Sequence, residues 1–261
     1  MSGTNGDRVV IVMVGLPARG KTYIARKIAR YLSFFHGAPT ETFNVGEYRR
    51  RMAGTKDLTH KFFAAEDVGT SVQREEFAAA AMADLKAFIT ADSSMGRVAI
   101  FDGTNSNIKR RAWILEELRS VLPTKNHVLF VESICRDKQI IESNIRATKL
   151  HSPDYEGWSE DAAVADFNAR IGHYERAYES LDDISDGPAP DVPLEGQTDW
   201  GHDHLSWIKL IDCGRQVRRE LGCGRLLGWR GHPSAPVGRR CDCSRPAITR
   251  AEAVAPWGRR E

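Results

Sequence analysis

The sequence predicts an α/β fold, a three-layer sandwich in which a mostly parallel central sheet lies between two layers of helices. Three observations predict it. A β-branched apolar run at 9–14 ends at a glycine, a loop closing on Gly20, Lys21 and Thr22 follows, and a segment with helical periodicity continues to Leu32. Later apolar runs alternate with helix-periodic segments, which is typical of strands joined by crossover helices.

The loop at 15–22 has the spacing of a Walker A phosphate loop, so the predicted fold is of the P-loop NTPase type. Glycines allow successive backbone N–H groups to surround a phosphate, and the N-terminus of the following helix adds partial positive charge. In such a loop Lys21 contacts the β- and γ-phosphates, and the Thr22 hydroxyl binds Mg²⁺. An ordinary glycine turn is the alternative, and the strand and helix on either side favour phosphate binding.

The composition permits one full core and excludes several classes of protein. The chain has 261 residues, of which 41% are hydrophobic, and its net charge of +2 argues against a general nucleic-acid-binding surface. No apolar signal segment precedes the first strand and no run of about 18 apolar residues occurs, so we expect no membrane segment and a soluble, cytoplasmic protein. The five scattered cysteines do not predict a disulfide framework.

The domain organisation follows from shifts in composition. We expect a flexible N-terminus at 1–7 and a single α/β domain at 8–220, in which Pro- and Gly-rich sequence at 184–204 indicates a surface insertion. The segment 221–261 is rich in Arg, Gly, Pro and Cys without apolar periodicity, which predicts a disordered tail. Its cysteines and His232 do not have the spacing of a zinc site.

Apolar patterns predict the remaining elements of the domain. Strands are expected at 42–46, 97–102, 127–135 and 205–212, with the last one completing the sheet, and helices at 68–89, 108–121, 137–150 and 159–181. Ser159 has the N-cap position of the last helix, with acidic residues in its first turn. The basic run 47–51 follows a strand end, where loops gather ligands, although a triple arginine is more often a solvated surface.

Four side chains near predicted strand ends and helix starts suggest chemistry. Asp102 ends an apolar strand, and in a P-loop protein such a carboxylate holds Mg²⁺ directly or through water; the alternative is a cap of the next helix. Arg110 and Arg111 in the first turn of a helix oppose its dipole, which favours a role with an anionic ligand. Cys135 lacks a paired base, so we interpret it as a small buried side chain rather than a nucleophile.

Absent motifs separate the classes of P-loop protein. A regulatory GTPase needs Asn-Lys-x-Asp and Asp-x-x-Gly motifs, and the sequence contains neither. A small-molecule kinase fits better, because arginines near several strand ends would hold a phosphorylated acceptor against the γ-phosphate.

Several motifs in order along the chain carry a closer resemblance. They are Gly15–Tyr23, Phe43–Arg50, Phe101–Asn105, Val131–Cys135, Asn144–Arg146 with Lys149, Ser152–Tyr155 and Leu205–Gly214. Together, over residues 8–217, they resemble the kinase domain of the 6-phosphofructo-2-kinase/fructose-2,6-bisphosphatase family.

The resemblance implies a 6-phosphofructo-2-kinase that transfers the ATP γ-phosphate to the C2 hydroxyl of fructose 6-phosphate, giving fructose 2,6-bisphosphate, a regulator of glycolysis. It implies ATP binding by Gly15, Leu16, Pro17, Ala18, Arg19, Gly20, Lys21, Thr22 and Tyr23, and by Asn144, Ile145, Arg146, Ala147, Thr148 and Lys149. It implies fructose 6-phosphate binding by Arg49, Arg74, Thr104, Arg110, Lys149, Arg170 and Tyr174. It also implies Mg²⁺ at Thr22 and Asp102, and active-site roles for Lys21, Asp102, Lys149 and Cys135, the last without nucleophilic chemistry.

The sequence departs from the family near its end. The family's bisphosphatase uses an Arg-His-Gly motif at a strand end, whereas residues 230–232 have another order and no strand before them, so we expect no bisphosphatase activity. Two alternatives stay open, another P-loop kinase with a different phosphorylated acceptor and a non-catalytic regulatory protein. Together Lys21, Thr22, Asp102, Lys149 and the arginines argue against the second. A homodimer is also left open.

Overall fold

The computed structural model describes residues 7–54, 59–63, 68–91, 96–122, 127–149, 152–181, 205–212 and 216–220, which all belong to one compact unit, 1–225. The predicted insertion at 184–204, the tail at 221–261 and nearly all of the N-terminal segment at 1–7 lie outside the described residues. The division of the chain into a domain at 8–220 with these additions therefore stays a prediction.

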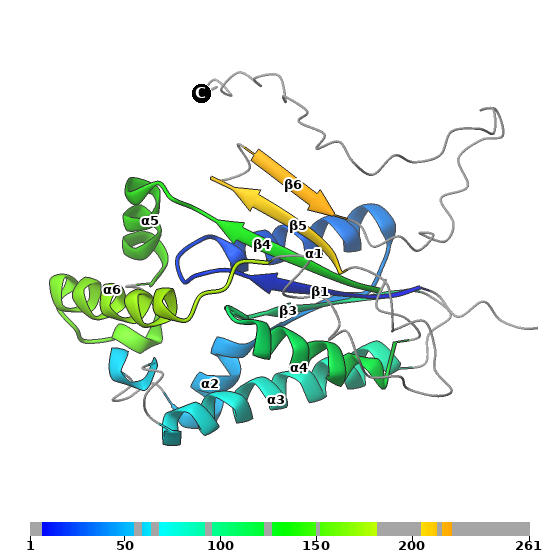
Figure 1. Ribbon diagram of the computed structural model, residues 1–261, viewed down its shortest axis with the longest axis horizontal. Helices are drawn as coiled ribbons and strands as arrows, with labels where there is room; N and C mark the ends of the chain where they lie inside the picture. Colours follow the sequence, from blue (N-terminus) through cyan, green and yellow to red (C-terminus); the bar gives the residue numbers. More distant parts are fainter. Residues whose placement is uncertain are drawn as a thin grey trace, which may run out of the picture. The chain divides into compact units, whose positions relative to one another are not determined.

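A six-stranded sheet forms the centre of the described part, in the order β2-β3-β1-β4-β5-β6 (Figure 1). Its strands are β1 (Arg8–Val14), β2 (Thr40–Asn44), β3 (Arg97–Asp102), β4 (Val128–Ile134), β5 (Ser206–Ile211) and β6 (Gln216–Glu220). The first five run parallel, and β6 pairs antiparallel with β5. The predicted α/β fold with a mostly parallel sheet is therefore confirmed.

Helices cover both faces of this sheet (Figure 1). They are α1 (Lys21–His36), α2 (Val45–Ala53), α3 (Val68–Thr90), α4 (Ile108–Arg119), α5 (Lys138–Asn144) and α6 (Glu160–Arg176), with the short turns η1 (His60–Phe63), η3 (Ile145–Lys149) and η4 (Pro153–Tyr155). Ser159 caps α6 as predicted, because its side chain accepts a hydrogen bond from the Ala162 backbone N–H. In the described ranges no helix is both long and apolar enough to span a membrane.

β1 is the central strand because both of its faces are apolar. Val10, Val12 and Val14 pack with α3 and α4 on one face of the sheet, and Ile11 and Met13 pack with α1 on the other. Side chains of a strand alternate between faces, so a strand that is covered on both sides has a continuous apolar sequence. This is why the run at 9–14 identified the strand.

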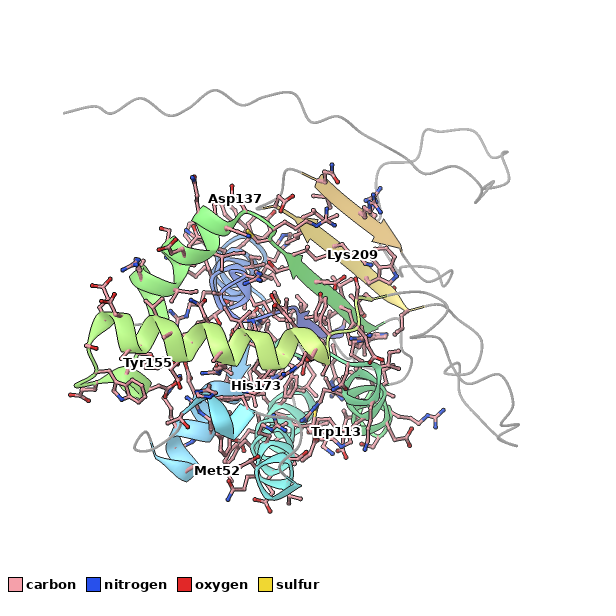
Figure 2. All side chains as sticks on the ribbon, turned by 60° about the vertical axis from the view of Figure 1, so that its left-hand side comes forward. Met52, Trp113, Asp137, Tyr155, His173 and Lys209 are labelled. Carbon is pink, nitrogen blue, oxygen red and sulfur yellow. The ribbon has the colours of Figure 1, made fainter. Side chains whose placement is uncertain are left out.

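A separate apolar cluster joins the phosphate loop to the helices at the edge of the site. Ala18 of the loop packs with Ile145, Tyr155, Phe167 and Ile171. Figure 2 shows Tyr155 close to α6, the helix that carries Phe167 and Ile171. The loop therefore rests on α6 as well as on the sheet.

Several sequence expectations about the elements were wrong; for example, the helix expected to reach 181 ends at Arg176. The segment after β2 is the helix α2 rather than a ligand-gathering loop, because the Asn44 side chain accepts from the Glu47 N–H over 3.1 Å and caps the helix. The sheet ends with β6 rather than with the strand at 205–212. Residues 216–219 are exposed, including Val217 at 57%, so β6 has no apolar pattern to reveal it.

Candidate functional site

The phosphate loop joins β1 to α1, and its path depends on glycine. Gly15 has φ 134°, and a Cβ there would lie 2.5 Å from the Ser133 carbonyl oxygen, so only glycine allows the loop to approach β4 so closely. Gly20, the N-cap of α1, has a left-handed backbone with φ 83°. The loop thus ends at a helix N-terminus, where free N–H groups and the helix dipole favour an anion.

Side chains of the loop fold back onto it. The Lys21 ammonium donates to the Leu16 carbonyl oxygen over 2.7 Å, and Lys21 is only 9% exposed. Arg19 donates to the Pro17 carbonyl oxygen over 3.0 Å and lies 3.4 Å from the Glu175 carboxylate of α6. These contacts keep two cationic groups at the loop, where phosphate charge would be neutralised.

The end of β4 and the end of α5 support the loop from another side. The Ser133 hydroxyl donates to the Arg19 carbonyl oxygen over 2.5 Å, and the Asn144 amide donates to the Ala18 carbonyl oxygen over 3.1 Å. Cys135 follows β4 and is buried, as predicted, at 6% exposure. Two carbonyl groups of the loop are therefore held by side chains from β4 and α5.

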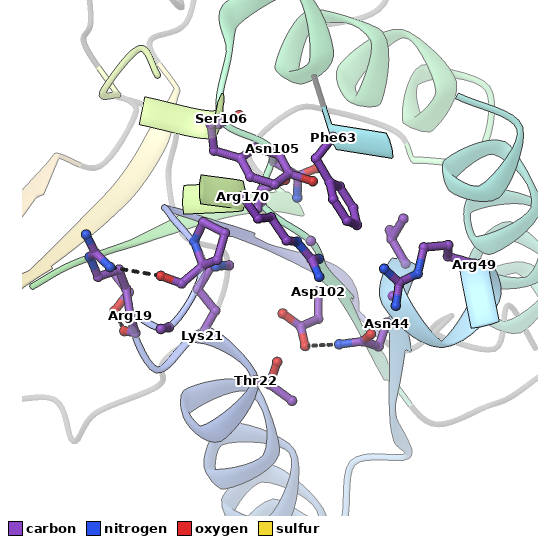
Figure 3. A pocket seen from close by; sticks show the side chains of 18 of the residues that line it. Arg19, Lys21, Thr22, Asn44, Arg49, Phe63, Asp102, Asn105, Ser106 and Arg170 are labelled. Atoms are coloured by element: carbon purple, nitrogen blue, oxygen red, sulfur yellow. Dashed lines mark hydrogen bonds between the residues drawn. The ribbon is translucent and has the colours of Figure 1, made fainter. Parts of the chain in front are cut away.

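Asp102 is the last residue of β3 and only 2% exposed. It is in register with Asn44 of β2, whose amide donates to the Asp102 carboxylate over 2.5 Å. Figure 3 shows the side chains of Lys21, Thr22 and Asp102 around the same space. The strand-end carboxylate and the phosphate loop therefore line the same cavity.

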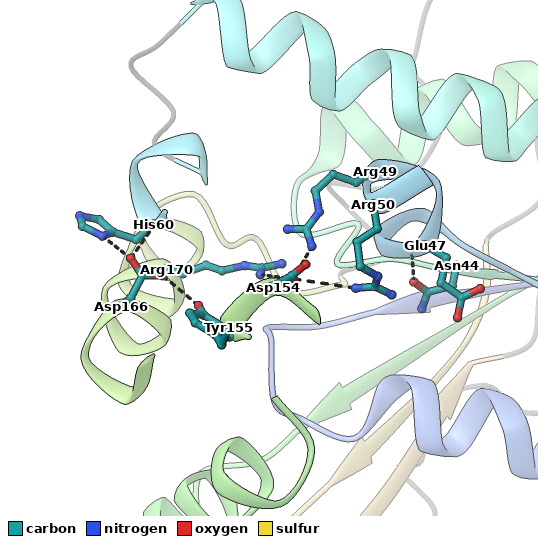
Figure 4. Close-up of polar contacts among 9 residues, drawn as sticks. All are labelled: Asn44, Glu47, Arg49, Arg50, His60, Asp154, Tyr155, Asp166 and Arg170. Atoms are coloured by element: carbon teal, nitrogen blue, oxygen red, sulfur yellow. Dashed lines mark hydrogen bonds and ion pairs between the residues drawn. The ribbon is translucent and has the colours of Figure 1, made fainter. Parts of the chain in front are cut away.

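Arginines from separate elements meet at one buried carboxylate, Asp154 of η4 (Figure 4). Arg49 of α2 forms a short ion pair with Asp154, while Arg50 and Arg170 lie 3.8 and 3.9 Å from the same oxygen. The Asp154 side chain is 7% exposed. A carboxylate thus holds Arg49 and Arg170, two of the predicted acceptor-binding residues, next to each other.

The arginines nevertheless keep buried donors without partners. Within the described ranges, Nε and Nη1 of Arg49, Nη1 of Arg110 and Nε of Arg170 are buried and make no hydrogen bond. Burial lowers the pKa of Arg49 and of Arg110, and the nearby Arg170 lowers that of Arg49 further. Buried cations with unmet donors are costly. An anion with several oxygens would satisfy them, so this part of the site indicates an anionic ligand.

The two arginines at the start of α4 have different roles. Arg110 lines the cavity and pairs with Glu75 of α3 over 2.7 Å. Arg111 is 1% exposed, and it donates to the carbonyl oxygens of Asn105 and Glu179 over 3.3 and 2.8 Å. Only Arg110 therefore fits the predicted anion-binding role, and Arg111 holds backbone segments together.

A single cavity of about 1020 Å³ brings most predicted site residues together. Those that line it are Pro17, Ala18, Arg19, Gly20, Lys21, Thr22, Tyr23, Arg49, Arg74, Asp102, Thr104, Arg110, Cys135, Asn144, Arg170 and Tyr174. Gly15, Leu16, Ile145, Arg146 and Ala147 are not at its wall. Arg146 instead pairs with Glu142 and Glu160 at the surface. The side chains of Thr148 and Lys149 lie outside the described part, so their roles stay predictions.

Sequence reasoning gave no role to Asp154 or to Asn44. Asp154 stands in a motif that carried the family resemblance, but nothing local indicates that it would contact arginines more than 100 positions away or on the next helix. Asn44 did have a signal, since Glu47 follows it by three residues, a spacing typical of a helix start.

The residues at the loop side fit magnesium and nucleotide phosphates. Mg²⁺ prefers oxygen ligands and often takes one or two carboxylates together with substrate phosphates and water. Thr22 and Asp102 supply a hydroxyl and a carboxylate at the wall of the cavity. The described residues contain no group of three or more His, Cys, Asp or Glu that would form an all-protein metal site, and a Mg²⁺ bound with substrate does not need one.

A phosphate loop after the central strand, a carboxylate at the end of the neighbouring strand and helices on both faces define a protein of the P-loop α/β class. A family model described as 6-phosphofructo-2-kinase matches residues 1–189. The chain therefore belongs to the 6-phosphofructo-2-kinase family.

Relatives in this family are bifunctional by name and longer. The chain is 40% identical over 214 residues to 6-phosphofructo-2-kinase/fructose-2,6-bisphosphatase 1 of Bos taurus, a match that covers 81% of this chain and 40% of the relative. It is 42% identical over 205 residues to 6-phosphofructo-2-kinase/fructose-2,6-bisphosphatase of Gallus gallus, covering 78% and 39%. The chain thus spans about 40% of the length of these relatives.

Among solved structures, the chain is similar to Chaetomium thermophilum Kti12 in complex with ADP-AlF3. The sequences are 17% identical, the TM-score is 0.47, and the match covers 69% of this chain and 86% of that chain.

Proposed function

We propose that this chain is a 6-phosphofructo-2-kinase, which transfers the γ-phosphoryl group of ATP to the C2 hydroxyl of fructose 6-phosphate. The observation that carries the proposal is that one cavity holds both a phosphate loop with a strand-end carboxylate and arginines with unmet buried donors. Membership of the 6-phosphofructo-2-kinase family supports the same pair of substrates. We also propose that the protein acts in the cytoplasm and that its product regulates glycolysis.

ATP would bind at the loop side of the cavity. Its β- and γ-phosphates would meet the backbone N–H groups at 15–22 and the Lys21 ammonium. Thr22 and Asp102 would hold Mg²⁺, which reduces the charge repulsion between an attacking oxygen and the phosphates. Lys149 would lie between the two substrates, as the family resemblance implies.

Fructose 6-phosphate would bind at the arginine side. Its phosphate has the oxygens that the unmet donors of Arg49, Arg110 and Arg170 require. Arg74, Thr104 and Tyr174 line the same wall and would complete the contacts to the sugar phosphate. Fixing both substrates converts an encounter of two anions into a transfer between positioned groups, which supplies much of the rate enhancement.

The reaction is an in-line displacement. A bond forms between the C2 oxygen and the γ-phosphorus, the bond from that phosphorus to the bridging oxygen breaks, and ADP leaves. The C2 hydroxyl proton must be accepted, and Asp102 is the candidate for it. Since phosphoryl transfer needs mainly positioning and charge neutralisation, the proposal gives Cys135 no covalent role.

The first test is whether the purified chain consumes ATP only when fructose 6-phosphate is added, with fructose 2,6-bisphosphate identified as the product. We expect Lys21→Met and Asp102→Ala to abolish this turnover. Lys86→Met is a matched control, because Lys86 of α3 pairs with Glu117 of α4 and neither residue lines the cavity. Near-full turnover in a folded Lys21→Met or Asp102→Ala protein would contradict the roles assigned to these residues. Turnover with other sugar phosphates but not with fructose 6-phosphate would contradict the proposed substrate.

A further inference from the structure

Phe63, the last residue of η1, lies where the acceptor-binding side chains meet. It is 5% exposed and lines the cavity. The Arg170 guanidinium carbon lies 3.7 Å from the centre of its ring, and that of Arg49 lies 5.5 Å from it. Figure 3 shows the ring beside Arg170, within the cavity wall. Two arginines from α2 and α6 thus contact one aromatic ring.

Two further acceptor-binding residues also contact Phe63. Arg74 of α3 donates to the Phe63 carbonyl oxygen over 3.0 Å, and the Tyr174 ring centre lies 5.9 Å from the Phe63 ring centre. Four of the side chains proposed to hold fructose 6-phosphate therefore touch this one residue. The phenylalanine side chain has no titratable or hydrogen-bonding group, so its sequence position alone indicated no role.

The chemistry of the contact suits a site that must bind an anion. An aromatic face attracts a guanidinium through its electron-rich surface and takes up none of the N–H groups, which lie in the guanidinium plane. A carboxylate, in contrast, occupies the N–H groups that a phosphate needs, as Asp154 does for part of Arg49. The ring therefore explains how Arg49 and Arg170 are held in place while some of their buried donors stay unmet.

η1 itself is attached firmly to α6. The backbone N–H and the Nδ1 of His60 both contact one Asp166 oxygen, over 2.8 and 2.7 Å, and the Tyr155 hydroxyl donates to the other oxygen over 2.9 Å. The His60 ring also stacks on His173 of α6, with the ring centres 5.7 Å apart. Phe63 is thus carried by a turn that is fixed to the helix of Arg170 and Tyr174.

We propose that Phe63 is a positioning residue for the sugar phosphate. Its ring sets the orientation of the Arg49 and Arg170 guanidinium groups, so that their free N–H edges face the phosphate of the acceptor. This inference rests on the proposed kinase function. It adds a residue that does not itself bind the phosphate and works through the arginines that do.

Kinetics of Phe63→Leu test the proposal, because leucine fills much of the space without an aromatic face. We expect the KM for fructose 6-phosphate to rise roughly five- to thirty-fold, with the KM for ATP unchanged. Phe63→Tyr keeps the ring and is expected to restore most of the affinity. Phe88→Leu is the matched control, since Phe88 also lies under an arginine, Arg97, but outside the cavity. It should leave both KM values unchanged.

Thermal unfolding of each variant shows whether a loss comes from unfolding. An unchanged KM for fructose 6-phosphate in Phe63→Leu would overturn the inference. So would an equal rise in the KM for ATP and the KM for fructose 6-phosphate. A Phe63→Tyr protein that lost as much affinity for fructose 6-phosphate as Phe63→Leu would also overturn it. The wild-type chain is measured first. If it shows no turnover that depends on fructose 6-phosphate, the proposed function fails, whereas normal wild-type turnover with an unaffected Phe63→Leu protein contradicts only the role of Phe63.

Discussion

Arg49, Arg50 and Arg51 show how much the environment differs between identical neighbours. Arg49 is 4% exposed and pairs with Asp154, Arg50 is half-buried at 28%, and Arg51 lies over the Tyr48 ring at an exposed position. Consecutive residues of a helix point about 100° apart, so one helix turn directs the three side chains to different surroundings. The triple arginine is therefore neither a uniform solvated surface nor a uniform ligand site.

Substitution of Arg49 by lysine tests its role. Lysine keeps the charge but loses the planar set of donors that binds a phosphate through two bonds. We expect the KM for fructose 6-phosphate to rise roughly ten- to one-hundred-fold, since a hydrogen bond to a charged group contributes about 1.5–3 kcal/mol. Arg51→Lys provides the control and should leave kinetics unchanged. If Arg49→Lys and Arg51→Lys had the same KM for fructose 6-phosphate, Arg49 would not be a residue that binds the acceptor.

Glu132 shows a second kind of buried charge, one with its partners supplied by the protein. It is fully buried on β4, and it accepts hydrogen bonds from Tyr178 and, over 3.0 Å, from Ser180, with the Lys209 ammonium 3.5 Å away. Burial, and secondarily the hydrogen bond to Glu132, raises the pKa of Tyr178, so its hydroxyl stays a donor. The segment after α6 is in this way tied to the sheet, and no ligand is needed to complete the contacts.

At the scale of elements, the phosphate loop depends on its approach to β4. Gly15→Ala would place a Cβ 2.5 Å from the Ser133 carbonyl oxygen. Overpacking of this kind costs about 1–3 kcal/mol, in addition to the strain of a positive φ. We therefore expect Gly15→Ala to lower the melting temperature and to abolish ATP binding, measured by calorimetry.

Gly37→Ala separates the two causes. Gly37 follows α1 with φ 60°, and a Cβ there would meet no atom within 4 Å. The substitution therefore carries only the backbone strain of about 1–2 kcal/mol and should keep ATP binding. ATP binding by Gly15→Ala at wild-type affinity would show that the close approach to β4 is unnecessary for the site.

The elements that could be predicted are those whose environment is uniform along their length. β1 and β3 are buried on both faces, so their apolar runs identify them, and Ser159 marks the start of α6 by its own hydrogen bond. β6 could not be predicted, because its side chains are exposed and it is a strand only through its pairing with β5. The apolar pattern of a sequence therefore indicates buried strands much better than it indicates which exposed strands pair.

At the scale of the whole molecule, ligand binding should stabilise the fold. A ligand at about one hundred times its Kd adds roughly 2.7 kcal/mol to the unfolding free energy. For a chain of this size that corresponds to a rise of roughly 5–10 °C in Tm. We expect ATP with magnesium to produce such a rise and Lys21→Met to reduce it, measured by thermal unfolding. A wild-type chain whose Tm does not respond to ATP would contradict nucleotide binding, independently of any activity assay.

The site was predictable in part, for a physical reason that applies to the whole molecule. Parallel strands place their carboxyl ends together, so Lys21, Thr22 and Asp102 could be brought to one edge from their sequence positions alone. Arg110 was indicated by its place in the first turn of a helix and Arg49 by its place after a strand end, whereas Arg74 and Arg170 came from the family resemblance alone. Asp154 and Phe63 could not be assigned, because their contacts come from α2, α3 and α6, whose relative placement no local pattern encodes.

One main-chain hydrogen bond crosses from one half of the site to the other. The Gly15 N–H donates to the carbonyl oxygen of Thr104 over 2.9 Å, and Thr104 belongs to the predicted acceptor site. The phosphate loop and the wall proposed to bind the sugar phosphate are therefore linked through backbone atoms that substitution of a side chain does not remove. With both substrates bound as proposed, the main chain would fix the distance between the ATP phosphates and the phosphate of the acceptor. Acceptors would then be selected by the distance between their phosphate and their reacting hydroxyl.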